Sequence, residues 1–454
     1  MRHQPWCEPD SCQSGLNKMS SSSLSQTELN LQLLDFLSAS PTPFHAVANM
    51  AQRFDQAGFI ALDETKNWDL QAGQGYYLQR SQSAIIAFIM GDNLHQGWHL
   101  IGAHTDSPCL KVKPNPELHS QGYFQLGVEV YGGALLHPWF DRDLGLAGRV
   151  FYQSQNRLQS ALIDFARPIA IIPSLAIHLD REANNNHSIN SQRDLPPILL
   201  QSECKLDFRA LLLDQTQQQY PNQPIERVMD YELCFYDYQQ PSVLGLNQDF
   251  IAGARLDNLL SCFIGMMSLL QAPMTLQHSC LLVCTDHEEV GSQSVCGAQG
   301  PFLKALLQRI YPNPEDFYRV LSQSWLVSAD NAHGIHPNFA DRHDSQHGPL
   351  LNKGPVLKIN ANQRYATTGE TSAIFRQISQ RLGIPLQTFV IRTDMACGST
   401  IGPITAATLG VNTVDIGVPT FAMHSIRELA GSQDAYYLYQ ILKYFYRESD
   451  LLAF

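Results

Sequence analysis

The stretch SCLLVCT (residues 279–285), followed at once by DHEE (286–289), has the pattern of a strand in an α/β sheet with functional groups at its end. Seven mostly apolar residues are too few for a buried helix and are typical of a strand covered on both faces. In open α/β sheets, ligands bind beyond the carboxyl ends of the strands. The residues that follow each predicted strand are therefore the first candidates for a functional site.

Short apolar runs of the same kind recur along the chain. They predict further buried strands at residues 84–90, 99–103, 325–328, 389–391 and 411–416. Apolar residues at helical spacing predict helices at residues 31–37, 46–54, 256–270 and 371–382. Because strands and helices alternate, the predicted fold class is α/β.

The middle of the chain, from about residue 107 to 243, follows a different pattern. Apolar and polar residues alternate in short pieces there, at residues 123–131, 149–152 and 169–179. Its inner part, 184–240, is rich in Gln and Asn and is predicted to hold long surface loops. We therefore expect a mainly β insertion.

Composition excludes several classes of protein. The chain has 454 residues, 44% of them hydrophobic and 16% charged, which excludes a disordered protein. Its net charge of -12 has the wrong sign for a nucleic-acid partner. The apolar runs are too short to span a membrane, and ten cysteines without a CxxC pair predict reduced thiols in the cytoplasm. Residues 1–27 are polar and Ser-rich, so we expect a disordered lead, with Met19 a candidate true start.

Metal-ligating side chains follow the predicted strands. His104, Glu289 and Asp330 each lie within four residues after the end of one, Asp257 begins a predicted helix, and His424 follows the strand at 411–416. Imidazoles and carboxylates without cysteine suit Zn, Mn or Co, and a shared carboxylate gives a two-metal hydrolytic site. Asp257 could bridge the two ions. His104 and Asp330 would then complete one of them, and Glu289 and His424 the other.

Glu288 remains free beside these ligands. A carboxylate next to the ions, but not bound to them, can act as the general base for a metal-activated water. Taken singly, each residue has a simpler interpretation, because a lone His or Asp at a strand end is more often a cap or a solvated turn residue, and Asp257 could simply start its helix. The joint occurrence at successive element ends favours a metal site.

Five motifs then carry a resemblance to a known family. They are GAHTDSP (102–108), RLDN (255–258), DHEEVGS (286–292), SADNAH (328–333) and MHS (423–425). In these motifs, and in their order from about residue 30 to the end, the chain resembles the M18 metallopeptidases, the aspartyl aminopeptidase family.

The resemblance implies an architecture and a metal centre. A three-layer zinc-peptidase catalytic domain, residues 28–107 and 246–454, would be interrupted by a β-rich dimerisation domain at 108–245. Each subunit would hold two divalent ions, Zn with Mn or Co as alternatives. The family's metal ligands match His104, Asp257, Glu289, Asp330 and His424. Its general base matches Glu288, and Asp106 would orient His104 through a hydrogen bond.

The resemblance also implies substrate contacts and partners. His178 would reach a neighbouring subunit's active site, and His333 and Lys358 would bind substrate. A cationic Lys358 would suit an acidic N-terminal residue of a peptide, Asp or Glu. Without the resemblance, His178 would be a core histidine on an apolar strand and Lys358 a surface lysine. The expected partners are peptide substrates and other copies of the chain, as dimers that build a dodecamer.

Alternative functions remain to be distinguished. A serine hydrolase would need Gly-x-Ser-x-Gly, which is absent, and an HExxH peptidase would need His where position 291 is Gly. Related dizinc hydrolases stay open: an aminopeptidase of broader specificity, a carboxypeptidase or an N-acyl amino acid deacylase. A non-enzymatic assembly protein with a decayed site is the alternative from another class.

Overall fold

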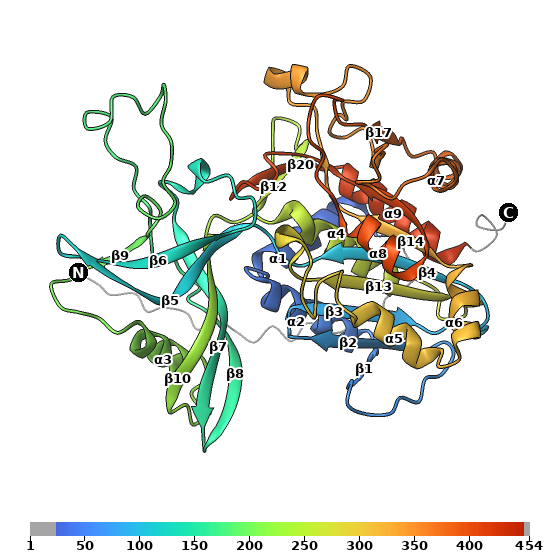
Figure 1. Cartoon of the computed structure of the whole chain (residues 1–454), viewed down its shortest axis with the longest axis horizontal. Helices are drawn as coiled ribbons and strands as arrows, with labels where there is room; N and C mark the ends of the chain where they lie inside the picture. The colour runs from blue at the N-terminus through green and yellow to red at the C-terminus, as the bar shows by residue number, and fades with distance from the viewer. Residues whose placement is uncertain (1–23, 449–454) are drawn as a thin grey trace, which may run out of the picture.

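A nine-stranded mixed sheet forms the centre of one of the two lobes of the molecule (Figure 1). The computed structural model describes residues 24–448. The strands, in spatial order, are β1 (Ile60–Ala61), β2 (Gly75–Arg80), β3 (Ala84–Ile89), β13 (Ser279–Thr285), β4 (Trp98–His104), β14 (Trp325–Ala329), β18 (Asn412–Gly417), β16 (Val356–Lys358) and β17 (Gln387–Phe389). The adjacent strands β13, β4, β14 and β18 run parallel, so their carboxyl ends meet at one edge of the sheet.

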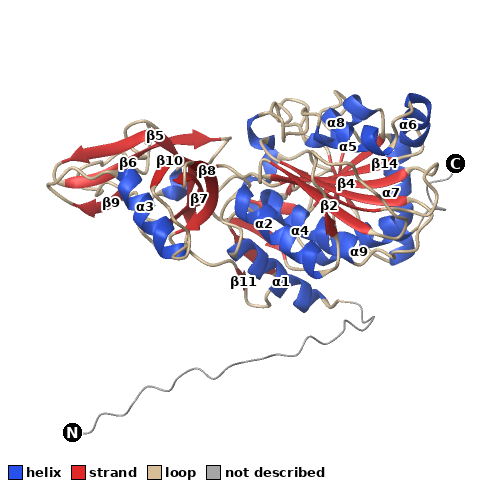
Figure 2. Ribbon diagram, turned by 90° about the horizontal axis from the view of Figure 1, so that it is seen from below, coloured by secondary structure: helices blue, strands red, loops and turns tan. Residues whose placement is uncertain are grey.

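Both faces of this sheet are covered, as its continuous apolar strands predict. In β3, Ile85 and Ile89 join one hydrophobic core, and the alternate residues Ile86 and Phe88 join another. One core packs against α1 (Gln26–Ser38), α2 (Pro43–Gln56), α4 (Leu256–Leu270), α7 (Gly369–Leu382) and α9 (Asp434–Arg447), and the other against α5 (Phe302–Ile310), α6 (Pro314–Leu321) and α8 (Ile401–Leu409). The result is the expected three-layer α/β architecture (Figure 2). Within residues 24–448, no helix has the length and apolar character needed to cross a bilayer.

The first helix begins earlier than the sequence pattern predicts. Helix α1 starts at Gln26 and is capped by Ser25 in a reciprocal capping box. Residues 26 and 27, the end of the expected disordered lead 1–27, are therefore helical. The cap satisfies the first backbone N–H groups of the helix before the apolar residues begin. Residues 1–23, including the candidate start Met19, lie outside the described residues.

The second lobe is a six-stranded antiparallel sheet with its own core. Its strands, in spatial order, are β8 (Arg157–Asp164), β7 (Leu144–Ser154), β10 (Arg227–Asp237), β5 (Cys109–Ser120), β6 (Tyr123–Tyr131) and β9 (Ile198–Gln201), and helix α3 (Phe208–Gln219) packs on β10. These elements fall between Cys109 and Asp237, where the sequence predicts a β-rich insertion.

One prediction within the insertion is wrong. The alternating residues 169–179 do not form a strand: only Ala170 and Ile171 make isolated bridges, and no neighbouring strand pairs with the rest. The Gln- and Asn-rich segment 184–240 holds a long loop at 184–197, as predicted, and it also contains β9, α3 and β10. Its apolar residues, such as Phe208, join the core of the insertion and supply enough burial to order it.

A third, five-stranded sheet was not predicted. It consists of β11 (Ser242–Leu244), β12 (Phe250–Gly253), β20 (Glu428–Gly431), β19 (Pro419–Phe421) and β15 (Ala332–His333). Strands of two to four residues are too short to show a periodic pattern in the sequence. The 3-10 turns η1 (His137–Trp139), η2 (Glu288–Val290) and η3 (Pro337–Arg342) complete the described elements.

Two stacked histidines join the central sheet to the end of α9. The rings of His99 and His278 lie 3.8 Å apart, and both side chains are buried. His99 Nδ1 donates to the carbonyl of Phe445 at 2.7 Å, and His278 Nε2 donates to that of Tyr446 at 2.8 Å. Burial lowers the pKa of both imidazoles, and for His99 the neighbouring ring adds to the effect.

We expect acid to destabilise the protein partly through this pair. As the pH falls through about 6.5, the unfolded chain binds protons at both histidines more readily than the folded chain does, so the free energy of unfolding falls by up to about 1.4 kcal/mol per pH unit for each. Denaturant titrations between about pH 7 and about pH 5 measure the slope. His278→Phe should reduce it, and a change at the exposed His95, such as His95→Gln, should not. Equal slopes for His278→Phe and the unchanged protein would contradict this account.

Candidate metal centre

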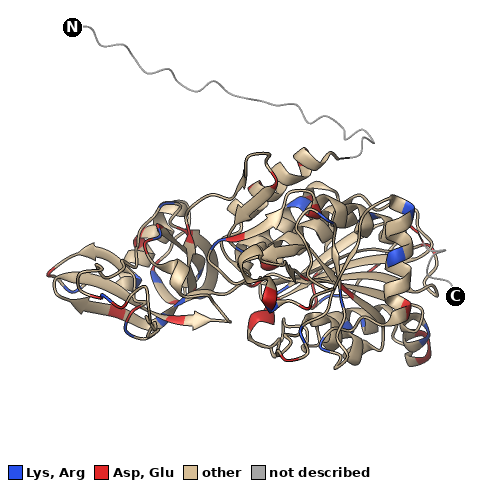
Figure 3. Ribbon diagram, turned by 90° about the horizontal axis from the view of Figure 1, so that it is seen from above, with Lys and Arg blue, Asp and Glu red and all other residues tan. Residues whose placement is uncertain are grey.

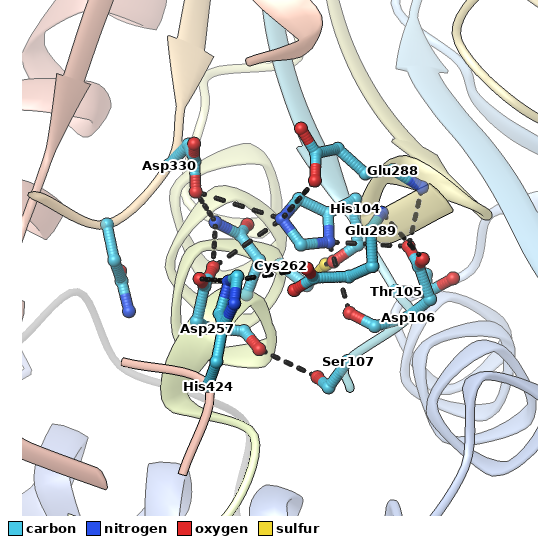
Figure 4. Close-up of polar contacts among 12 residues, drawn as sticks. His104, Thr105, Asp106, Ser107, Asp257, Cys262, Glu288, Glu289, Asp330 and His424 are labelled. Atoms are coloured by element: carbon cyan, nitrogen blue, oxygen red, sulfur yellow. Dashed lines mark hydrogen bonds and ion pairs between the residues drawn. The ribbon is translucent and has the colours of Figure 1, made fainter. Parts of the chain in front are cut away.

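Five side chains converge at the carboxyl edge of the central sheet (Figure 4). They come from the end of β4, the turn after β13, the end of β14, the first turn of α4 and the turn between β19 and β20. In that order they are His104, Glu289, Asp330, Asp257 and His424. The structure thus brings together all five residues that the sequence predicts as metal ligands.

The carboxylate of Asp257 lies between the two histidines. Its Oδ1 is 3.5 Å from His104 Nε2, and its Oδ2 is 3.5 Å from His424 Nε2. On the outer sides, His104 Nε2 is 3.7 Å from Asp330 Oδ1, and His424 Nε2 is 3.3 Å from Glu289 Oε2. The donors form two groups that share Asp257, with one of its oxygens in each.

These separations fit metal coordination. Two nitrogen or oxygen ligands at about 2.0–2.1 Å from a tetrahedral zinc ion lie roughly 3.4 Å from each other. Among the described residues, Glu289 Oε1 is buried and has no hydrogen-bond partner, as expected of an atom that faces a cation. The five residues therefore fit the coordination of divalent metal, with Asp257 placed between the two histidines.

The centre concentrates negative charge in a buried place. Burial, followed by the charge of Asp257, raises the pKa of Glu289. For His424, burial opposes protonation, but Asp257 and Glu289 outweigh it and raise the pKa to about 9. Asp257 itself keeps a low pKa, since the two histidines outweigh its burial. Such a cluster is stabilised by cations.

Asp106 lies behind His104. Its Oδ1 is 3.3 Å from His104 Nδ1 and accepts the backbone N–H of Glu288 at 3.1 Å. Its Oδ2 accepts the hydroxyl of Tyr131 at 2.7 Å and the backbone N–H of Glu289 at 3.1 Å. One carboxylate therefore contacts the imidazole, the turn that carries both glutamates, and a strand of the insertion. Its role in orienting His104 stays a prediction.

Glu288 lies beside the two donor groups. Its Oε2 is 4.0 Å from His104 Nε2, and its side chain is 16% exposed. Burial raises its pKa, and the negative charges of Asp330 and Asp257 add to this effect. A partly exposed carboxylate at the edge of the centre can exchange a proton with a water held there.

Two residues support the ligands in roles that the sequence does not predict. Glu428, buried at the start of β20, accepts the backbone N–H of Asp257 at 2.9 Å and that of His424 at 2.7 Å. Asn258 donates from Nδ2 to Asp330 Oδ1 at 2.8 Å. The DN pair was visible as a motif, but Glu428 lies in a strand too short to predict, so no pattern points to it.

The backbone beside the ligands is strained. His424 has a φ of 68°, Arg255 of 62° and His287 of 64°, all in the left-handed region that non-glycine residues rarely adopt. Each position lies within two residues of a candidate ligand. Such strain persists only where the surrounding structure holds it, and it clusters at functional sites.

The predicted substrate residues have three different environments. Lys358 is buried and donates from Nζ to Asp330 Oδ2 at 3.0 Å and to the carbonyl of Asn331 at 3.1 Å, so the interpretation as a surface lysine is wrong. His333 lines a pocket of about 420 Å³ that His424 also borders. His178 lies on an exposed turn of the insertion, so the interpretation as a core histidine on a strand is wrong too.

Comparisons with known proteins agree with this geometry. A family model described as Aminopeptidase I zinc metalloprotease (M18) matches residues 36–446. A protein of Azotobacter vinelandii (strain DJ), named probable M18 family aminopeptidase 2, is 60% identical over 425 residues, which cover 93% of this chain and 98% of that protein.

Solved structures are also similar. A cryo-EM structure of the Ape4 and Nbr1 complex has a chain with a TM-score of 0.89 and 37% identity, covering 93% of this chain and 86% of that chain. The S. cerevisiae mApe1 dodecamer has a chain with a TM-score of 0.79 and 29% identity, covering 92% of this chain and 95% of that chain.

Proposed function

The chain belongs to the M18 family of zinc metalloaminopeptidases, and from this premise we propose that it removes the N-terminal residue of peptides, preferably Asp or Glu, at a centre of two divalent ions. The observation that carries the proposal is the position of Asp257, with one oxygen toward His104 and the other toward His424. We propose zinc for both ions, with manganese and cobalt as the alternatives.

When these residues hold two divalent ions, the Lewis acidity of the ions would polarise the scissile carbonyl and would make a water nucleophilic at neutral pH. The protein's own groups carry out the proton transfers. The Glu288 carboxylate takes the proton of the attacking water and passes it to the nitrogen of the departing amine. Asp106 holds His104 and the turn of Glu288 in place through the contacts described above.

An acidic N-terminal residue suits the groups near the centre. Lys358 provides a buried cation beside Asp330, and the pocket next to His424 is lined by His333 and Arg342. Positively charged and hydrogen-bond-donating side chains favour a carboxylate over an apolar group. We therefore propose His333 and Lys358 as substrate-binding residues.

We further propose that residues 108–245 form a dimerisation domain and that dimers assemble into a dodecamer. The loop around His178 exposes Leu175, Ile177 and Leu179 by 60%, 47% and 74%, which suits burial against another subunit. His178 would thereby complete the active site of a neighbouring subunit. The cysteines among the described residues are free thiols, which supports a cytoplasmic location.

A panel of peptides tests the activity. We expect the metal-free protein to be inactive and zinc to restore cleavage, with Asp- and Glu-peptides cut roughly 10-fold or more faster in kcat/KM than Leu-peptides, as one charged hydrogen bond predicts. Manganese and cobalt are added in parallel to compare the three metals.

Each alternative has its own outcome in the same assay. Equal cleavage of Leu-peptides indicates a broader aminopeptidase, and release of an acyl group or of the C-terminal residue indicates a deacylase or a carboxypeptidase. A folded, metal-loaded oligomer that cleaves none of the peptides would be a non-enzymatic assembly protein.

A further inference from the structure

A second cluster of metal-ligating side chains lies on the segment that follows β13. Asp286, His287 and Cys296 each offer one donor atom, and the three atoms lie within 4.8 Å of one another. Asp286 and Cys296 are buried, whereas the His287 side chain is 34% exposed and opens the cluster to solvent. None of the three belongs to the centre formed by the five ligands described above.

The distances in this cluster fit a thiolate site. His287 Nδ1 lies 3.6 Å from Cys296 Sγ. A sulfur at about 2.3 Å and a nitrogen at about 2.0–2.1 Å from a tetrahedral zinc ion are roughly 3.5 Å apart. Asp286 Oδ2 lies 3.6 Å from the other ring nitrogen, His287 Nε2, so the side chains must adjust before all three donors, which lie within 4.8 Å of one another, contact one ion.

The surroundings of Cys296 favour the form of sulfur that binds metals. Ser83 Oγ is 3.7 Å and Ser294 Oγ 3.6 Å from its Sγ. Burial opposes ionisation, but the imidazole and the two hydroxyls outweigh it and lower the pKa of Cys296. The thiolate, not the thiol, is the ligand for a soft cation.

We propose that Asp286, His287 and Cys296 form a third metal site, which binds a soft divalent cation such as Cd²⁺ or excess Zn²⁺. The site differs in chemistry from the catalytic centre, whose donors are all nitrogen and oxygen. Its occupancy slows hydrolysis, because His287 directly precedes Glu288 and an ion on the imidazole displaces the 2.9 Å contact between His287 Nδ1 and Ser294 Oγ. The proposed metal binding does not depend on the proposed function, whereas the proposed inhibition does.

A cadmium titration tests the binding. Zinc-loaded enzyme, dialysed free of excess metal, should develop the ultraviolet charge-transfer band of a cadmium–thiolate bond and bind one Cd²⁺ beyond its zinc content. Cys296→Ser should lose this band, and His287→Gln should weaken the binding by about 10-fold or more, as the loss of one ligand predicts. Cys204→Ser, at an exposed cysteine of the insertion, is the matched control and should keep the band.

Cadmium displacing zinc at the catalytic centre would give no thiolate band, so the two events are distinguishable. Thermal melting of each variant confirms that it is folded, and the His287→Gln result keeps the test valid if Cys296→Ser does not fold. A band that persists in both variants, or its absence in the unchanged enzyme, overturns the proposal. Inhibition by the added cadmium should also be lost in Cys296→Ser, and a protein without peptidase activity would fail only this last measurement.

Discussion

The variant Glu288→Gln should retain its metal ions and lose nearly all turnover. Gln has the shape of Glu but cannot accept a proton, so the attacking water and the departing amine both lose their proton carrier. General acid–base catalysis by one side chain contributes up to about 10⁴-fold, and we expect kcat to fall by roughly 10³-fold or more. Stopped assays with an Asp-peptide measure the loss, and elemental analysis measures the bound metal.

The geometry gives this result its physical reason. Glu288 Oε2 lies 4.0 Å from His104 Nε2, near enough to reach a water at the centre, and the backbone of Glu288 is held by Asp106. The backbone contact does not depend on the side chain, so the turn should keep its position in the variant.

Glu370→Gln is the matched control, because Glu370 is an exposed glutamate in the first turn of α7. It should have unchanged kinetics. Substantial turnover by a fully metal-loaded Glu288→Gln variant would contradict the assignment of Glu288 as the general base. Loss of metal from the variant would instead indicate that Glu288 is a ligand.

The variant His178→Phe should assemble normally and yet lose activity. His178 lies on an exposed turn. Within one chain, among residues 24–448, it therefore has no role at the metal centre. If it reaches a neighbouring subunit, its removal takes one hydrogen bond from the bound substrate. We expect kcat/KM to fall by roughly 10- to 100-fold.

Mixed assemblies separate this role from a structural one. Coexpression of Glu288→Gln and His178→Phe chains should restore activity, because in a mixed dimer the site with an intact Glu288 receives His178 from the other chain. Each mixed dimer then has one complete active site. Size-exclusion chromatography confirms that both variants assemble.

His187→Phe is the control for this experiment. His187 is another exposed histidine of the same loop region, where it pairs with Asp180 at 2.9 Å. Its replacement should leave the kinetics unchanged. Mixed assemblies that stay as inactive as the separate variants would reject the contribution of His178 across the interface.

The sequence predicted the central sheet better than the rest of the fold. The run at 279–285 coincides with β13, and residues 256–270 coincide with α4, because long buried elements carry a clear apolar period. The segment 169–179 alternates in the same way as a strand, but only Ala170 and Ile171 make isolated bridges and the rest pairs with no strand. Strand pairing depends on partners distant in the chain, which a local pattern does not contain.

The candidate ligands were predictable for a related reason. Parallel strands bring their carboxyl ends to one edge, so residues that follow separate strands become neighbours without any other information. His104, Glu289 and Asp330 were found in this way. Judged by its own strand alone, Lys358 is expected to be exposed. The segments that pack around it in the folded chain make it a buried partner of Asp330.

By itself, the sequence determined the α/β class, the long buried strands and helices and the types of ligand, because apolar periodicity and chemical identity are local properties. Only the tertiary structure decided that the two oxygens of Asp257 face different histidines. It also decided that Glu428 holds the backbone of two ligands from a strand of four residues. These arrangements arise where segments far apart in the chain pack together, and that packing depends on the whole chain.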